Sequence, residues 1–164
     1  MEKYELVDIS GNKTGKILTY DGSGNRNNIP KGYYMSVVGV IVINNNNEIL
    51  LQKRSKSKKV NPSKWGICGG KVEIGETTLE AGIRETLEEI GILLNKEDLN
   101  FLNMNISDNV HFTVYYVRKN IDANKCKLQA EEVEKIKYFN IEELKNLDNE
   151  GFEWLEKLRE VIEV

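Results

Sequence analysis

The chain has 164 residues, of which 40% are hydrophobic and 30% are charged, so it can bury a core beneath a well-solvated surface. This length suits one domain spanning residues 1–164, and the composition is unlike that of a disordered chain. A formal net charge of −3 argues against a protein dedicated to duplex DNA, which needs an excess of Lys and Arg to displace counterions.

The sequence has the character of a protein that neither crosses a membrane nor is secreted. Its longest apolar run covers residues 37–43, far short of the roughly 20 residues that cross a bilayer. The first five residues carry charge and have no apolar segment behind them. Cys68 and Cys126 stand far apart, as expected of reduced thiols. We therefore expect a cytoplasmic protein.

The first half of the chain contains two predicted hairpins. Residues 4–9 and 16–20 form short strands that turn at residues 10–12. Residues 33–43 are rich in β-branched and aromatic side chains, and residues 48–54 follow them after four asparagines. Because asparagine tolerates turn geometry and positive φ, the asparagine run predicts a hairpin between these two strands.

Residues 77–90 change to a helical period. Thr77 with Glu80 fits a capping box, and Gly91 is placed to end the helix in a left-handed conformation. Gly82 costs about 1 kcal/mol relative to alanine, and a close backbone contact on its side would explain it. The apolar positions at helical spacing predict a buried stripe of Leu79, Ile83, Leu87 and Ile90.

The remaining elements are two strands and a helical tail. The strands are residues 109–118 and 135–139, and the helical period covers residues 141–147 and 151–164. The apolar face of the tail consists of Phe152, Leu155, Leu158 and Ile162. Strands followed by a helix, further strands and closing helices predict an α/β fold, with helices packed on the faces of a mixed sheet.

Three glutamates gather on the predicted helix, on the side opposite its apolar stripe. At about 100° per residue, Glu85, Glu88 and Glu89 share this side, where an acidic solvated face would explain them if they stood alone. However, Gly69 and Gly70 precede the helix, and a glycine turn lets backbone carbonyls approach a site closely. Mg²⁺ prefers carboxylate and carbonyl oxygens, and with one histidine in the chain any metal must rely mainly on carboxylates.

Residues 70–92 resemble the Nudix box, G-x5-E-x7-R-E-U-x-E-E-x-G-U, in which U is a bulky aliphatic residue. Thr86 departs from the pattern at the first aliphatic place, and Ile92 fills the last one. Every fixed position matches, namely Gly70, Glu76, Arg84, Glu85, Glu88, Glu89 and Gly91. The wider resemblance to the Nudix hydrolase superfamily covers most of the chain. It implies the Nudix fold, α/β with a mixed sheet sandwiched between helices (α/β/α).

The resemblance also implies site residues and a cofactor. Glu85, Glu88 and Glu89 match the positions that bind metal, helped by the carbonyl at Gly70. The implied ion is Mg²⁺, with Mn²⁺ as an alternative. Arg84 matches a position that supports the loop–helix–loop through ion pairing, and we group it with the three glutamates as the catalytic candidates.

The implied reaction is hydrolysis of the diphosphate linkage in a nucleoside diphosphate linked to another moiety. Metal ions would neutralise the phosphates and lower the pKa of a bound water, and one glutamate would act as general base. A further acidic residue after the box often assists in the family, and Glu131 or Glu132 matches that place. A charged turn before a strand explains these two residues equally well. The implied partner is a small nucleotide diphosphate, and many relatives are homodimers.

Two other functions stay open. The N-terminal half is similar to the isopentenyl-diphosphate isomerase-like branch, whose members carry a cysteine close to the place of Cys68. Those isomerases also need a glutamate near the position of Asn109 and a histidine-based metal site, for which the single His111 is too few. We therefore interpret Cys68 as a small buried residue. The other alternative is a Nudix-like module that binds a nucleotide without cleaving it. The loss of box glutamates would be the sign of such a module.

Two groups of side chains outside the box bear on the substrate. The basic segment at residues 53–59 is either a solvated loop or an attractor of phosphorylated ligands through Lys56, Lys58 and Lys59. Five aromatic side chains could stack on a base or belong to the core: Tyr33, Tyr34, Trp65, Phe112 and Tyr115.

Overall fold

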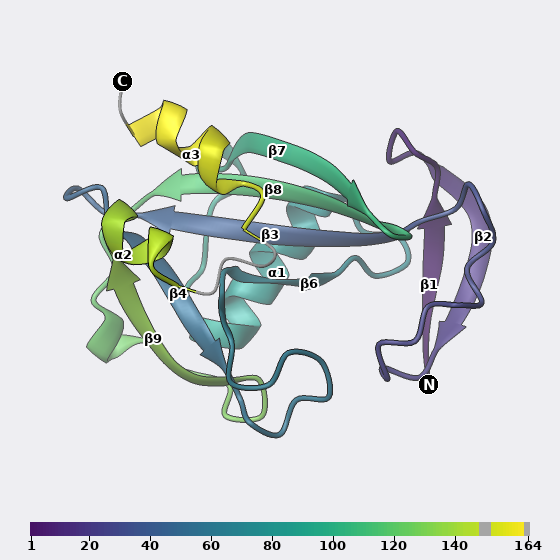
Figure 1. Cartoon of the computed structure of the whole chain (residues 1–164), viewed down its shortest axis with the longest axis horizontal. Coiled ribbons are helices and arrows are strands. Elements are labelled where there is room, and N and C mark those ends of the chain that lie inside the picture. The colour runs from purple at the N-terminus through teal and green to yellow at the C-terminus, as the bar shows by residue number, and fades with distance from the viewer. Residues whose placement is uncertain (148–151, 163–164) are drawn as a thin grey trace.

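The computed structural model describes residues 1–147 and 152–162. Within these ranges, a mixed sheet of seven strands forms the centre of the molecule (Figure 1). The strands are β3 (Met35–Ile43), β4 (Ile49–Arg54), β5 (Trp65–Gly66), β6 (Cys68–Lys71), β7 (Asn100–Ser107), β8 (Val110–Arg118) and β9 (Val133–Phe139). β3 is parallel to β8 on one side and antiparallel to β6 and β4 on the other.

Helices cover both faces of this sheet, as predicted (Figure 1). The helices are α1 (Thr78–Ile90), α2 (Ile141–Lys145) and α3 (Leu155–Ile162). Because side chains alternate along a strand, Val40 and Val42 of β3 pack on one face with Ile90 of α1. Ile41 points to the other face and packs with Leu158 of α3. The α/β/α arrangement inferred from the order of elements is therefore confirmed.

The two predicted hairpins are present. The first consists of β1 (Glu2–Val7) and β2 (Lys13–Tyr20). In its turn, Asp8 Oδ1 accepts hydrogen bonds from the backbone N–H groups of Ser10 and Asn12, each at 2.9 Å. The second joins β3 to β4, and Asn47 adopts the left-handed conformation there with φ 57°. Asparagine thus supplies the positive φ that the turn requires.

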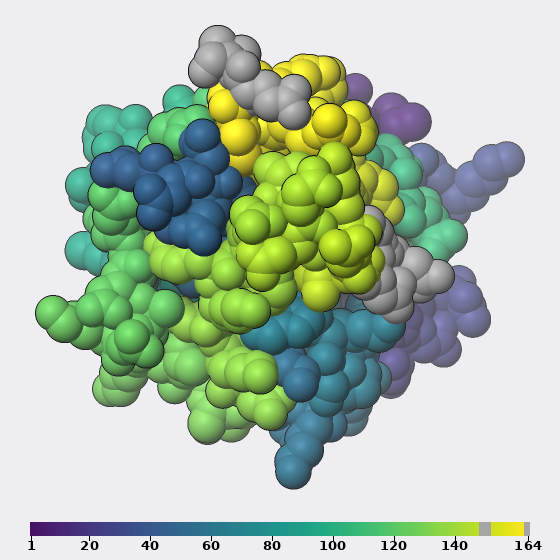
Figure 2. All heavy atoms as spheres, turned by 60° about the vertical axis from the view of Figure 1, so that its left-hand side comes forward, coloured from purple at the N-terminus to yellow at the C-terminus, as the bar shows by residue number. Residues whose placement is uncertain are grey.

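The N-terminal hairpin forms a separate two-stranded sheet at one end of the molecule (Figure 1). A single bridge, between Val7 and Tyr34, links it to the segment that leads into β3. Its own core consists of Tyr4, Leu6, Leu18, Tyr20, Ile29 and Met35. In Figure 2 the opposite end comes forward, where α2 and α3 cover the central sheet and the hairpin lies behind.

The inward face of α1 differs from the prediction. Leu87 is 45% exposed, and Leu79 and Ile83 are only partly buried. The physical reason is the predicted close contact at Gly82, where a Cβ would lie 2.9 Å from Cγ2 of Val40. Of the predicted stripe, Ile90 is fully buried as expected, and the other buried positions of the helix are Ala81, Gly82, Thr86 and Glu89.

The three glutamates consequently do not share one solvated face. Glu89 is 3% exposed, Glu85 is partly buried, and Glu88 is exposed. Thr86, the one departure from the box pattern, is fully buried, and its hydroxyl donates to the carbonyl of Gly82 at 2.8 Å. A polar residue fits this aliphatic place because the helix backbone itself accepts its hydrogen bond.

Sequence patterning misses β5, β6 and β7, and it extends the tail too far. In β7 the residues Asn100, Asn103 and Asn105 interrupt the apolar alternation that marks a strand. The tail is helical in α2 and α3, and residues 146–147 and 152–154 of the predicted helices are not helical. Residues 151, 163 and 164 of the predicted helices lie outside the described residues. Phe152, Leu155 and Leu158 are buried as predicted. In the part of the chain that is described, every helix is too short or too polar to span a bilayer.

Candidate active site

Gly69 and Gly70 on β6 bring the strand backbone against its neighbours. A Cβ at Gly70 would lie 2.5 Å from Oε1 of Glu85, and a Cβ at Gly69 would lie 2.0 Å from the carbonyl oxygen of Val38. Any other residue would therefore force the strand or α1 to move. The glycine pair lies in strand β6 rather than in the expected turn, and it brings the backbone of β6 directly against the Glu85 carboxylate.

The helix that carries the glutamates begins and ends at the predicted caps. Thr77 is the N-cap, and its side-chain oxygen accepts a hydrogen bond from the backbone N–H of Glu80 at 3.1 Å. Gly91 ends the helix in the left-handed conformation with φ 75°. These two caps determine where α1 begins and ends.

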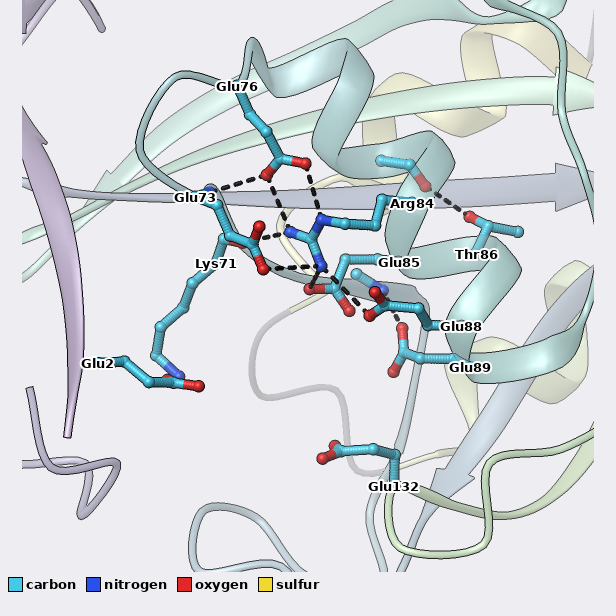
Figure 3. Close-up of polar contacts among 12 residues, drawn as sticks. Glu2, Lys71, Glu73, Glu76, Arg84, Glu85, Thr86, Glu88, Glu89 and Glu132 are labelled. Carbon is cyan, nitrogen blue, oxygen red and sulfur yellow. Dashed lines mark hydrogen bonds and ion pairs between the residues drawn. The ribbon is translucent and has the colours of Figure 1, made fainter.

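Arg84 occupies the space between the acidic side chains (Figure 3). Its Nε and Nη2 donate to the two oxygens of Glu76 at 2.7 and 2.9 Å. Its Nη1 donates to Oε1 of Glu85 at 3.0 Å and to Oε2 of Glu88 at 3.2 Å. The hydrogen bond with Glu76 raises the pKa of Arg84 against the opposing effect of burial. Arg84 is therefore a fixed countercharge that ties α1 to the loop before it.

Glu89 is held from inside the protein. Its Oε2 accepts from Nε2 of Gln52 at 2.8 Å, and its Oε1 accepts from the backbone N–H of Gly69 at 2.8 Å. Burial raises the pKa of Glu89 to about 7, although these two hydrogen bonds act to lower it. Gln52 in turn accepts a hydrogen bond from Sγ of Cys68 at 3.2 Å. Gln52 is not among the residues predicted for the site. What points to it in the sequence is a polar residue directly after the apolar start of β4.

Glu132 faces the same space from the turn before β9. Its side chain forms an ion pair with Lys58 of the basic segment. Figure 3 shows it across an open space from Glu89, and its charge acts to raise the pKa of both Glu85 and Glu89. Glu131 lines the same cavity as Glu132. Glu131 and Glu132 therefore line the same space that the box glutamates face, which favours a role in the site over a simple charged turn.

The donor set of this site suits a hard divalent cation. Burial raises the pKa of Glu85, and the charges of Glu88 and Glu132 act in the same direction, while Arg84 opposes them. A divalent cation would relieve this repulsion and accept carboxylate oxygens as ligands. In residues 1–147 and 152–162, however, no group of three or more His, Cys, Asp or Glu side chains is arranged to hold a metal ion as it stands. The guanidinium of Arg84 lies among these carboxylates instead.

A cavity of about 720 Å³ opens between this site and the N-terminal hairpin. Gly70 and Glu132 line it on the acidic side, and Tyr20 lines it on the side of the hairpin. Lys58 and Lys59 of the predicted basic segment also line it, so this segment contributes to a concave surface and is more than a solvated loop.

The five aromatic candidates are outside the lining of this cavity, to which Tyr20 contributes the one aromatic ring among the described residues. Trp65 packs edge-on against another ring of the core, with centroids 5.0 Å apart. The hydroxyl of Tyr115 is hydrogen-bonded to a threonine of α1 at 2.7 Å. Phe112 packs against the main core, and Tyr33 packs against the core of the hairpin. For these four residues the structure favours the core interpretation, while Tyr34 is partly buried and its backbone pairs with Val7.

The three residues that bear on the isomerase alternative have packing or hydrogen-bonding roles in the fold. Cys68 is buried, as predicted, and burial raises the pKa of its thiol, whereas a reactive cysteine needs a lowered pKa. The side-chain amide of Asn109 donates to the carbonyl of Arg26 at 2.7 Å. His111 is buried and packs against the turn at Gly11. None of these three residues is arranged for acid–base chemistry beside the box.

Comparison with known proteins places these observations in a family. The NUDIX domain model matches residues 33–158. An uncharacterized Nudix hydrolase of Listeria monocytogenes is 29% identical over 157 residues, which cover 92% of this chain and 87% of that protein. An isopentenyl-diphosphate Delta-isomerase of Photorhabdus laumondii is 30% identical over 99 residues, which cover 59% of this chain and 53% of that protein. A crystal structure from Deinococcus radiodurans shares the fold, with a TM-score of 0.70 and 21% identity over 87% of this chain and 86% of that chain. The chain therefore belongs to the Nudix family and is a hydrolase of that family.

Proposed function

We propose that this chain is a Mg²⁺-dependent Nudix hydrolase that cleaves the diphosphate linkage of a nucleoside diphosphate linked to another moiety. The observation that carries the proposal is the arrangement of Glu85, Glu88 and Glu89 on α1, with the backbone of Gly70 against the first of them. Beside these carboxylates lies a cavity of the size that small-molecule sites have. Mn²⁺ would serve at the same oxygens.

The residues of this chain would divide the work in a definite way. Bound at the box carboxylates, a divalent ion supplies charge neutralisation for the diphosphate and lowers the pKa of the attacking water. Arg84 holds Glu85 and Glu88 in position, and Gln52 orients Glu89. We assign Glu132, which faces them, as the acceptor of the proton from the water. The water oxygen then bonds to phosphorus as the bridging P–O bond breaks, which releases a nucleotide and a phosphorylated product.

The setting of this activity is part of the same proposal. Both cysteines are free thiols, which suits the reducing cytoplasm. The substrate is a small nucleotide rather than duplex DNA, because the chain carries a net charge of −3. We further propose that residues 1–164 act as one domain, and that two copies form a homodimer.

A panel of nucleotide diphosphate derivatives, incubated with Mg²⁺ or Mn²⁺ and analysed by mass, tests the proposal. The informative variant is Glu85→Gln, which removes one carboxylate charge while keeping its shape. We expect turnover to fall on the order of 100-fold or more, because the charge that attracts the metal is lost. Glu80→Gln is the matched control, because Glu80 lies exposed in the first turn of the same helix. Wild-type turnover in Glu85→Gln, or no cleavage of any member of the panel, would contradict the proposal.

A further inference from the structure

Two arginines on the wall of the cavity are anchored by neutral groups alone. Nε of Arg54, at the end of β4, donates to the carbonyl of Val60 at 3.0 Å. Nε of Arg26 donates to Oδ1 of Asn109 at 3.1 Å. Among the described residues, neither arginine has a carboxylate within ion-pair distance. Each guanidinium is thus fixed at one edge, and its two terminal nitrogens remain for a ligand.

The two arginines reach the cavity from segments that lie beside each other. Arg26 belongs to the loop after β2, and Arg54 is the last residue of β4, from which the basic segment continues as a loop. A Cβ at Gly24 of the first loop would lie 3.1 Å from Cγ2 of Val60 in the second, so the loops touch. Because Arg26 and Arg54 both line this cavity, they present two positive charges to the same open space.

Two of the three lysines that line the same cavity are already engaged, and the third, Lys59, is exposed and its charge acts to lower the pKa of Asp21. Lys58 is paired with Glu132. The ammonium of Lys71 lies 5.0 Å from the ring centroid of Tyr20, and Figure 3 shows its side chain extending toward Glu2. The two arginines are therefore the partly buried, anchored cations of the wall that have no carboxylate partner among the described residues. Their planar guanidinium matches the geometry of a phosphate in two parallel hydrogen bonds.

We propose that Arg26 and Arg54 form a subsite for a phosphate group of the substrate that lies outside the cleaved diphosphate. This inference rests on the proposed function for the place of the diphosphate itself. It names the substrate class more closely: a diphosphate compound that carries a further phosphate monoester. The lining of the cavity supports this inference. Within the described ranges, its wall carries several cationic side chains and one aromatic ring, whereas binding a base by stacking would need aromatic rings.

The first test measures binding of tripolyphosphate by calorimetry at low salt, with a chelator present. Without a metal ion the box glutamates repel anions, so binding reports the arginine subsite. We expect Arg54→Gln and Arg26→Gln each to weaken binding about 10-fold or more, since each removes a charge-assisted hydrogen-bonding group. Arg118→Gln is the control, because Arg118 contacts Asn47 at the other end of β8 and does not line the cavity. Equal weakening in all three variants, or no weakening in the first two, would overturn the subsite.

The second test addresses the substrate class with pairs of compounds that differ by one phosphate monoester, namely coenzyme A against 3′-dephospho-coenzyme A and NADP against NAD. We expect the more phosphorylated member of a pair to bind the wild-type protein about 10-fold more tightly, and Arg54→Gln to remove that preference. Equal affinity within both pairs would overturn the inference even if the panel above is hydrolysed. Retained preference without hydrolysis of any compound would instead contradict only the proposed function.

Discussion

Two regions on either side of the cavity satisfy the charge of an arginine in opposite ways. Around Arg84 four carboxylates lie between 2.7 and 3.7 Å from the guanidinium, those of Glu73, Glu76, Glu85 and Glu88. Arg54 is instead anchored by the backbone carbonyl of Val60. An arginine surrounded by carboxylates holds a structure together, whereas one fixed only by neutral oxygens is available to a ligand. Removing each charge should therefore have different consequences.

The largest effect is expected at Arg84. Arg84→Met would leave the box glutamates without their countercharge while keeping much of the side-chain volume. Because Arg84, Glu76 and Glu85 are partly buried, we expect a loss of about 2 kcal/mol in the free energy of unfolding, measured with urea. Turnover should fall on the order of 100-fold, since Glu85 and Glu88 lose the group that orients them.

Arg54→Met is the matched variant across the cavity. Its free energy of unfolding should stay within about 0.5 kcal/mol of wild type, because no buried partner loses its countercharge. A drop in stability as large as that of Arg84→Met would show that Arg54 also supports the structure, and the contrast between the two regions would disappear.

A smaller effect on turnover is expected at Gln52, which tests how the acidic region orients Glu89. Gln52→Leu would remove the donor to Oε2 of Glu89 and leave the backbone of Gly69 as its partner. We expect turnover to fall about 10- to 100-fold and Mn²⁺ to bind more weakly by electron paramagnetic resonance, as is usual when a residue that orients a metal ligand is lost.

Cys68→Ser is the control for this variant, because a serine hydroxyl can also donate to the Gln52 oxygen. We expect it to keep turnover close to wild type. If Cys68→Ser abolished activity while Gln52→Leu did not, the thiol itself would be required, and the isomerase alternative would return.

The features that could be predicted from sequence follow local rules. The caps at Thr77 and Gly91, the asparagine turn and the spacing of the box depend on residues close together in the chain. Even Gly82 was interpretable, because a glycine inside a helix signals a close contact. These rules were sufficient for the fold class and for the elements that carry the glutamates.

The parts that could not be predicted depend on contacts between distant residues. Periodicity alone placed Leu87 inside and Glu89 outside, and both assignments are wrong. Near Gly82 the helix lies so close to β3 that the inward positions beside it are small, as at Ala81, or hydrogen-bonded, as at Thr86. Glu89 is accommodated because Gln52 and the backbone of Gly69 come from other strands. Likewise, nothing near Arg26 in sequence indicates that its partner is Asn109.

An effect that depends on pH is expected at His111, whose polar ring is buried. It is 4% exposed, and neither ring nitrogen has a hydrogen-bond partner among the described residues. The carboxylate of Asp8 and the turn at Gly11 face it. Burial lowers the pKa of His111 below its ordinary value of 6.5, although the charge of Asp8 acts to raise it.

The folded protein therefore takes up this proton less readily than the unfolded chain does. Above about pH 6.5 both states are neutral at His111, and below it the unfolded state gains the proton first, so stability falls as the pH falls. Between pH 7.5 and 5.5, His111→Gln should lose on the order of 1 kcal/mol less stability than wild type in urea unfolding. Identical pH dependence in the two proteins would mean that the ring accommodates its charge. We compare this result with that of Arg54→Met. If the His111 difference appears and Arg54→Met leaves the free energy of unfolding unchanged, then a polar group without a partner affects stability only where it is buried. Arg54 lines the cavity instead, where water or a phosphate can reach it.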